Sequence, residues 1–132
     1  MSVYVDTSAF LAVLDADDGN HEKAKNTWRE LLVGRTPLIC SSYVLVETWA
    51  LVQNRLGMEA IKGFHEDILP LLKIEWVDQR IHQLGAVALI AANRRNLSLV
   101  DCVSFEIMRH TGIRTAFAFD EHFEDQGFVS LR

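Results

Sequence analysis

The sequence predicts an α/β protein in which helices cover a mostly parallel β-sheet. Short apolar runs typical of buried strands alternate along the chain with longer segments typical of helices. Right-handed crossovers between parallel strands bring the strand ends that precede helices to one side of the sheet. The 132 residues contain no repeat, linker or low-complexity tract, so we expect a single domain over residues 1–132.

The N-terminal third is predicted to form one strand and two helices. Val3–Val5 is a short apolar run that reads as a central strand. The hydroxyls of Thr7 and Ser8 are suited to capping a short helix over Ala9–Leu14. After a polar turn, His21–Val33 is amphipathic and ends at a glycine, which predicts a second helix.

The middle of the chain is predicted to add two strands and two helices. Pro37–Cys40 is apolar and reads as the second strand. Two serines then cap a helix that runs to about Leu56 and ends at a glycine. The next helix begins at Met58, runs to about Leu69 and is broken by a proline, and Lys73–Val77 reads as the third strand.

The C-terminal third is predicted to contain two helices and two strands. Asp78–Asn93 is a helix unusually rich in small residues, and Leu99–His110 is a helix closed by Thr-Gly. Arg114–Phe119 reads as the fourth strand and Gly127–Leu131 as the last. The small residues Gly85, Ala88 and Ala92 would allow close approach of another helix in a homodimer, although packing on the sheet explains them nearly as well.

Four carboxylates lie where predicted strands end or the following helices begin. Asp6 and Asp120 follow strands, Glu47 lies early in a helix, and Asp101 follows Leu-Ser-Leu-Val. In open α/β sheets, ligands bind outside the carboxyl ends of the strands. Four acids gathered there would repel one another strongly unless cations offset their charge. Hard oxygen donors around an open position predict a magnesium or manganese site.

Each acid also has a structural interpretation. Ser98-Leu-Val-Asp101 fits a capping box, and Asp6 and Asp120 stand where they would cap the helical turn that follows. Glu47 lies in an apolar segment, where an ionised group is costly unless it is paired or metal-bound. The structural alternative for Glu47 is a place in a surface stripe with Tyr43. Four acids that serve unrelated structural roles at one edge of the sheet are, however, less likely than one shared site.

Charge is unevenly placed along the chain. The net charge of −5 argues against a general nucleic-acid coat protein. Residues 80–114 nevertheless carry five arginines against two acids, whereas residues 115–132 carry one arginine against four acids. Arg94 and Arg95 close a predicted helix and are candidates for binding an RNA backbone, although a solvated helix end is an equally good interpretation.

Two further observations limit the class of protein. Cys40 and Cys102 read as small buried apolar residues rather than a disulfide framework. The longest uncharged apolar run is too short to cross a bilayer, and the acidic N-terminus does not read as a signal peptide. We therefore expect a cytoplasmic protein without a membrane anchor.

The four acids and their surroundings resemble the PIN-domain family, most of all the VapC-type ribonuclease toxins of toxin–antitoxin pairs. The resemblance covers nearly the whole chain and rests on Val-Asp6-Thr7-Ser8, Val-Leu-Val-Glu47-Thr, Leu-Ser-Leu-Val-Asp101 and Phe-Asp120-Glu-His-Phe123. It implies a three-layer α/β/α sandwich with about five mostly parallel strands. It also implies Mg²⁺- or Mn²⁺-dependent cleavage of single-stranded RNA, a homodimer, and a small antitoxin whose segment covers the acidic cleft.

The resemblance also implies roles for particular residues. By position, Asp6, Glu47, Asp101 and Asp120 are the catalytic acids, and Asp6 and Asp101 are the central metal ligands. The hydroxyl residues Thr7 and Ser8, with Arg94 and Arg95, are candidates for binding substrate. Family members often carry a basic residue after the fourth acid, and Glu121 stands there in this chain.

Other protein classes also place acids at strand ends. Receiver domains need a lysine after a late strand, but the last lysine is Lys73. Dehalogenase-type phosphatases need Asp-x-Asp after the first strand, and this chain has Asp6-Thr7-Ser8. The second-ranked function is therefore a non-catalytic PIN-like module that binds RNA or protein. Metal-dependent cleavage would separate it from a nuclease.

Overall fold

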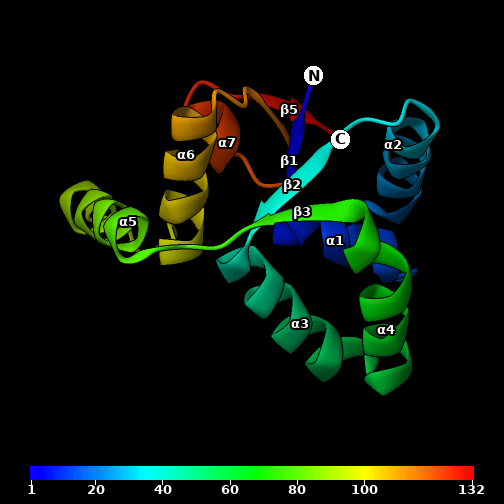
Figure 1. Cartoon of the computed structure of the whole chain (residues 1–132). Coiled ribbons are helices and arrows are strands. Elements are labelled where there is room, and N and C mark those ends of the chain that lie inside the picture. Colours follow the sequence, from blue (N-terminus) through cyan, green and yellow to red (C-terminus); the bar gives the residue numbers. More distant parts are fainter.

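A five-stranded, entirely parallel sheet forms the centre of the computed structural model, which describes residues 1–132 (Figure 1). The strands lie in the order β3-β2-β1-β4-β5. Their bounds are β1 Val3–Val5, β2 Leu38–Ser41, β3 Leu72–Glu75, β4 Thr115–Phe117 and β5 Val129–Leu131. The parallel sheet predicted from the alternation of strands and helices is confirmed.

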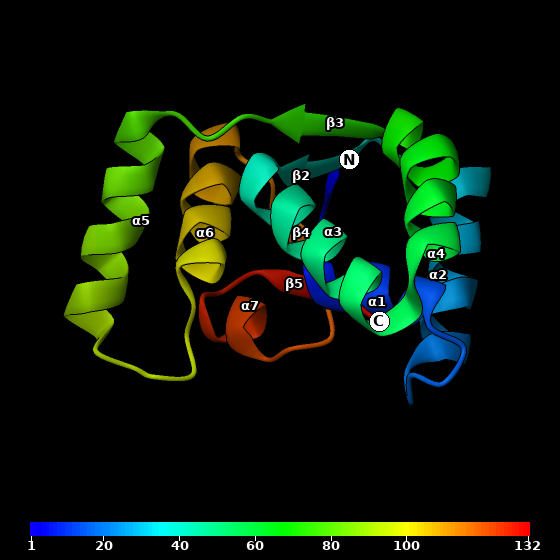
Figure 2. The ribbon, with the colours of Figure 1, turned by 90° about the horizontal axis from the view of Figure 1, so that it is seen from below.

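Helices cover both faces of the sheet. Their bounds are α1 Thr7–Leu14, α2 His21–Val33, α3 Ser42–Leu56, α4 Met58–Gly63, α5 Gln79–Ala92, α6 Leu99–Thr111 and α7 His122–Asp125. Figure 2 shows α1, α2 and α4 on one side of the sheet and α5, α6 and α7 on the other, with α5 outside α6. The arrangement is the expected three-layer sandwich. None of the helices combines the length and the apolar character that a membrane span requires.

Two strands and one helix end earlier than predicted. Strand β3 stops at Glu75, because the N–H of Val77 donates to Ser42 Oγ (2.9 Å). Strand β4 stops at Phe117, because the N–H of Phe119 donates to Ser8 Oγ (3.0 Å). Helix α4 gives way at Gly63 to a π-helical turn and then a 3₁₀ turn that contains a proline, which an α-helix interior does not accommodate.

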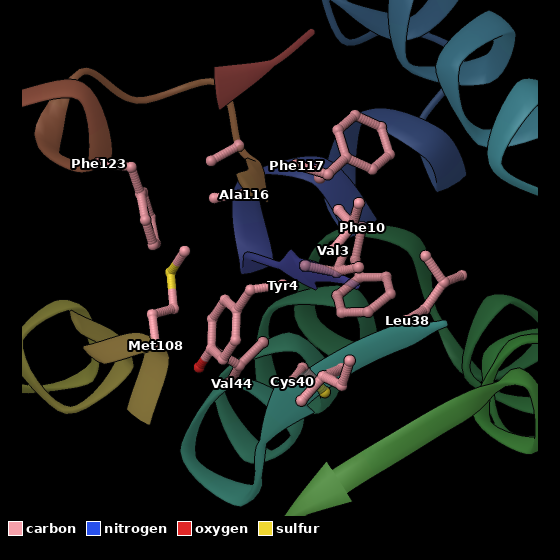
Figure 3. Packing of buried hydrophobic residues seen from close by; sticks show 14 of the residues in the cluster. Val3, Tyr4, Phe10, Leu38, Cys40, Val44, Met108, Ala116, Phe117 and Phe123 are labelled. Atoms are coloured by element: carbon pink, nitrogen blue, oxygen red, sulfur yellow. The ribbon is translucent and has the colours of Figure 1, made fainter. Parts of the chain in front are cut away.

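The core lies between β1, β2 and β4 and the helices on either face. Figure 3 shows apolar side chains from these strands packed against α1, α3 and α6. Fully buried members with large side chains are Tyr4, Phe10, Phe64, Met108, Phe117 and Phe123. Both cysteines are buried and free, as expected.

Helix α5 packs closely against α6 at Gly85. A Cβ atom on Gly85 would lie 2.6 Å from Val103 Cγ2, so only glycine permits this approach. Ala88 packs against the core, whereas Ala92 is exposed. At Gly85 the close approach predicted for a second copy or for the sheet is instead made by α6 of the same chain, so Gly85 does not support a dimer contact.

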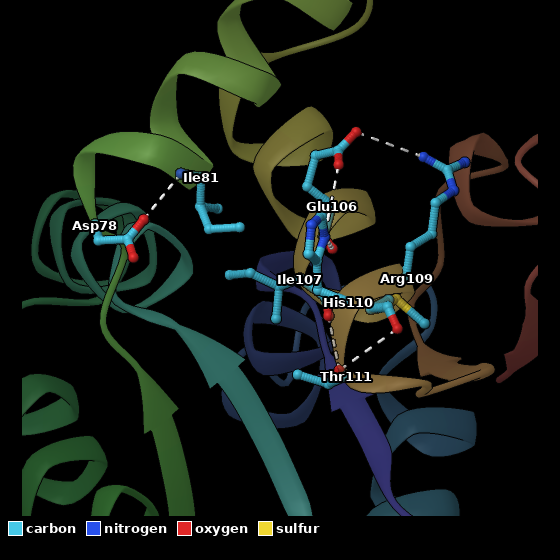
Figure 4. A network of polar contacts seen from close by, with 8 residues as sticks. Asp78, Ile81, Glu106, Ile107, Arg109, His110 and Thr111 are labelled. Carbon is cyan, nitrogen blue, oxygen red and sulfur yellow. Dashed lines mark hydrogen bonds and ion pairs between the residues drawn. The ribbon is translucent and has the colours of Figure 1, made fainter.

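Local side-chain contacts define the ends of these two helices (Figure 4). Asp78 begins α5 by accepting a hydrogen bond from the N–H of Ile81 (2.9 Å). Near the end of α6, Thr111 Oγ1 donates to the carbonyl of Ile107 (2.7 Å), and Gly112 follows at φ 74°. A left-handed residue at this position is favourable for glycine.

Candidate metal site at the carboxyl edge of the sheet

Three of the four predicted acids meet at one point. Asp6 is the N-cap of α1 directly after β1, Asp101 lies in the first turn of α6, and Asp120 follows β4. One carboxylate oxygen from each of the three lies within 4.8 Å of the others. Since β1 and β4 are neighbouring strands, the sheet itself brings Asp6 and Asp120 together.

Asp6 is held by the residue two positions later. Its Oδ2 accepts hydrogen bonds from the N–H (3.2 Å) and the hydroxyl (2.7 Å) of Ser8. The same hydroxyl accepts the bond from the N–H of Phe119, so Ser8 joins the ends of β1 and β4 beneath the cluster. The Ser8 hydroxyl therefore uses its one donor and one of its acceptor sites within the protein, although Ser8 was a candidate for binding substrate.

Asp101 and Asp120 are held in the same way. Asp101 Oδ2 accepts from the N–H of Ser98 (3.1 Å) while Ser98 Oγ accepts from the N–H of Asp101 (3.0 Å), which completes a capping box. Asp120 Oδ1 accepts from the N–H of His122 (3.1 Å). No hydrogen bond reaches the second oxygen of either carboxylate, or that of Asp6. Each carboxylate therefore accepts a local N–H with one oxygen and has a second oxygen without a hydrogen bond, so the local bonds do not prevent the three acids from sharing a site.

The electrostatics of the cluster favour a proton or a cation. Burial raises the pKa of Asp6 to about 8, with further increases from the charges of Asp120 and Asp101 and opposition from the hydrogen bonds of Ser8. Burial also raises the pKa of Asp101, against the hydrogen bond from the N–H of Ser98. Only 3% of Asp6 is exposed, so this carboxylate has little water to stabilise its charge.

The donor set fits a hard divalent cation. All three groups offer carboxylate oxygen, and the cluster includes no cysteine or histidine. Such donors suit Mg²⁺ and Mn²⁺ rather than soft metals. Each carboxylate has one oxygen fixed by its local turn and one oxygen free, so the donors are oriented before any cation binds.

Glu47 lies outside the group of three. It is half-buried on α3 and makes no hydrogen bond or ion pair in the structure. The next residue, Thr48, is fully buried, and its hydroxyl donates to Thr7 Oγ1 (3.3 Å). Helix α3 is therefore fixed beside the turn that carries Asp6. The sequence analysis missed Thr48, because a threonine in a helix has no distinctive polarity pattern.

Arg94 and Arg95 lie in the loop between α5 and α6, and both are exposed without an ion pair. With apolar residues of α5 they line a hollow of about 470 Å³. The loop is joined to the acid cluster by His122, whose Nε2 lies 3.0 Å from the carbonyl oxygen of Asn96. His122 was also missed, since its partner is 26 residues away in sequence.

Comparisons with known proteins agree with the fold. The PIN domain family matches residues 3–129. The 23S rRNA-specific endonuclease VapC20 from two strains of Mycobacterium tuberculosis is 33% identical over 132 residues, which cover 98% of this chain and 98% of that protein.

Two solved structures are similar to this chain. The crystal structure of Mycobacterium tuberculosis VapC20, described as a sarcin–ricin loop cleaving toxin, matches with a TM-score of 0.84 and 33% identity over 97% of each chain. FitAcB from Neisseria gonorrhoeae matches with a TM-score of 0.71 over 98% of this chain and 96% of that one. At 14% identity, the second likeness concerns the fold alone.

Proposed function

This chain belongs to the PIN-domain family, and on that basis we propose that it is a metal-dependent endoribonuclease that cleaves single-stranded RNA. The observation that carries the proposal is the convergence of three carboxylate oxygens within 4.8 Å at the carboxyl edge of the sheet. The likeness to VapC20 supports a toxin of a toxin–antitoxin pair as its biological role. A cytoplasmic location accompanies that role.

The acids divide into ligands and supporting groups. Asp6 and Asp101 would hold Mg²⁺ or Mn²⁺, with Asp120 beside them. A bound divalent cation lowers the pKa of water and offsets charge on the phosphoryl oxygens, so no side-chain nucleophile is needed. Glu47 would complete the outer shell or orient the attacking water. Ser8 keeps Asp6 in place through its two hydrogen bonds.

The substrate is proposed to be an unpaired or looped RNA segment. VapC20 is named for action on 23S rRNA and on the sarcin–ricin loop, and it shares 33% of its residues with this chain. Arg94 and Arg95 would bind backbone phosphates, because they are exposed and lack acidic partners. Thr7 would support the site through its position next to Asp6.

A cleavage assay tests the proposal. Purified protein is incubated with unstructured RNA, tRNAs and a sarcin–ricin loop hairpin, with Mg²⁺, Mn²⁺ or EDTA. We expect cleavage with either cation and none with EDTA, and no cleavage by Asp6→Asn or Asp101→Asn. Protein shown to be folded that cleaves none of these RNAs would favour the alternative function, a non-catalytic module that binds RNA or protein.

Two protein partners accompany this function. A small antitoxin would place a segment complementary to the acids over the cluster and thereby inhibit cleavage. Co-purification of this protein with the product of a neighbouring short reading frame would test this proposal. A homodimer would form through the exposed apolar face of α5, where Leu84, Val87 and Ile90 are 37%, 66% and 77% exposed. This face replaces the small-residue stripe as the proposed contact.

A further inference from the structure

The loop between α5 and α6 is short and is fixed at three points. Asn93 begins it in the left-handed conformation at φ 50°, and Leu97, which is 8% exposed, ends it in the core. Between them, the N–H of Leu97 donates to the carbonyl of Arg94 (3.2 Å), which tightens the turn. The third point is the bond between His122 Nε2 and the carbonyl of Asn96.

His122 links this loop to the acid cluster. Its backbone N–H donates to Asp120 Oδ1, and its ring reaches Asn96, the residue next to Arg95. A carbonyl only accepts, so Nε2 carries the proton in this bond. The other ring nitrogen, Nδ1, is buried and has no partner, so the ring makes its one side-chain hydrogen bond to the loop.

From this connection we infer that His122 is a positioning residue that fixes Arg94 and Arg95 for binding the phosphates of RNA. The inference rests on the proposed ribonuclease function. Two long, exposed arginines on a mobile loop would lose conformational entropy on binding, whereas a fixed loop reduces that loss. His122 thereby fixes the position, relative to the carboxylate cluster, of the loop from which the two arginines extend.

The test measures RNA binding separately from cleavage. Fluorescence anisotropy of labelled single-stranded RNA in EDTA gives Kd for the parent, His122→Leu, His122→Gln and the double variant Arg94→Gln/Arg95→Gln. We expect His122→Leu to bind about 3–10-fold more weakly, because it keeps bulk and loses the donor. His122→Gln, whose amide can donate to Asn96, is expected to bind within about twofold of the parent.

Salt dependence and additivity make the test specific. The logarithm of the RNA association constant falls linearly as the logarithm of the salt concentration rises. Losing two phosphate contacts makes this dependence shallower by about 1.4, since each contact to a single strand contributes about 0.7. His122→Leu is expected to make the salt dependence shallower, toward that of the arginine double variant. Added to the double variant, His122→Leu should change Kd by less than about twofold, because the residues it positions are already gone.

His110→Leu is the matched control. His110 Nδ1 also bonds a backbone carbonyl, that of Glu106 (2.7 Å), at the other end of α6 (Figure 4). The control should bind RNA as the parent does. The inference is overturned if His122→Leu binds as tightly as the parent, or if its effect adds fully to that of the arginine changes. A parent that binds RNA without cleaving it would instead refute the proposed catalysis.

Discussion

Asp6, Asp101 and Asp120 each use one carboxylate oxygen to stabilise a local turn, and the other oxygen of each has no hydrogen bond. At the residue scale, capping and cation binding are therefore not rivals. Local backbone N–H groups place the acids: Asp6 caps α1, Asp101 completes the capping box of α6, and Asp120 accepts from the N–H of His122. The same contacts then hold these acids at a distance where their mutual repulsion is large.

This repulsion predicts the effect of Asp6→Asn on stability. The pKa of Asp6 rises from 3.8 to about 8 on folding, so the folded state binds the proton more tightly. The protonated form therefore adds stability below about pH 4, which is lost as pH rises to about 8. In EDTA at pH 8 we expect Asp6→Asn to raise the free energy of unfolding by about 1–3 kcal/mol, because each pKa unit corresponds to about 1.4 kcal/mol.

Urea melts of the parent and Asp6→Asn in EDTA between pH 4 and 8 check this prediction. The parent should lose stability relative to the variant as pH rises, and the amide oxygen of asparagine should still accept the bonds of Ser8. Mg²⁺ should stabilise the parent by mass action and the variant much less. A variant that is less stable than the parent at pH 8 would show that Asp6 acts only as a cap.

At the element scale, a buried hydrogen bond connects the two segments that carry the proposed metal ligands Asp6 and Asp101. The hydroxyls of Tyr4 on β1 and Ser104 on α6 lie 2.7 Å apart, and neither residue is exposed. Tyr4 precedes Asp6 by two residues, and Ser104 follows Asp101 by three. Burial raises the pKa of Tyr4 far above its ordinary range, so the hydroxyl stays protonated.

Tyr4→Phe is expected to lower the free energy of unfolding by about 1–3 kcal/mol, because the hydroxyl of Ser104 is left buried without its partner. It should also raise the Mg²⁺ concentration that half-saturates thermal stabilisation, since Asp6 and Asp101 lose a fixed spacing. Thermal melts across a Mg²⁺ titration measure both. Tyr43→Phe, which removes a hydroxyl bonded to His82, is the control. An unchanged Mg²⁺ midpoint in Tyr4→Phe would leave the bond only a structural role.

The approach of α5 to α6 gives a second prediction at this scale. Alanine normally stabilises a helix by about 1 kcal/mol relative to glycine. Gly85→Ala should instead destabilise the protein by about 1–3 kcal/mol, since the new Cβ would lie 2.6 Å from Val103 Cγ2. Combining it with Val103→Ala should recover part of the loss in a denaturation experiment. A stabilised Gly85→Ala protein would mean that α5 moves away from α6 at little cost.

At the scale of the whole molecule, the exposed apolar face of α5 is its main unexplained surface feature. We expect Val87→Glu with Ile90→Glu to abolish a dimer, because two charges would be buried without partners. Light scattering at about 50 µM, where micromolar dimers are populated, measures the mass. Val33→Glu, on an equally exposed residue of α2, should keep the parent's mass. A monomeric parent would remove the dimer proposal.

Helix positions were predictable because their signals are local. Helix α2 occupies His21–Val33, as predicted, and α5 and α6 lie within one residue of prediction at each end, because Asp78, Ser98 and the glycine after α6 act on adjacent backbone groups. Strand ends were less accurate. The N–H groups that end β3 and β4 bond to Ser42 and Ser8, which are distant in sequence.

The sequence by itself determined the fold class, most of the helix bounds and the edge of the sheet at which Asp6, Asp101 and Asp120 lie, since these follow from periodicity and from the direction of parallel strands. Tertiary structure alone decided that Asp6, Asp101 and Asp120 come within 4.8 Å while Glu47 does not join them. It also decided that Ser8 meets Phe119 across 111 residues and His122 meets Asn96 across 26. Such distances depend on how whole elements pack, which no short sequence pattern encodes.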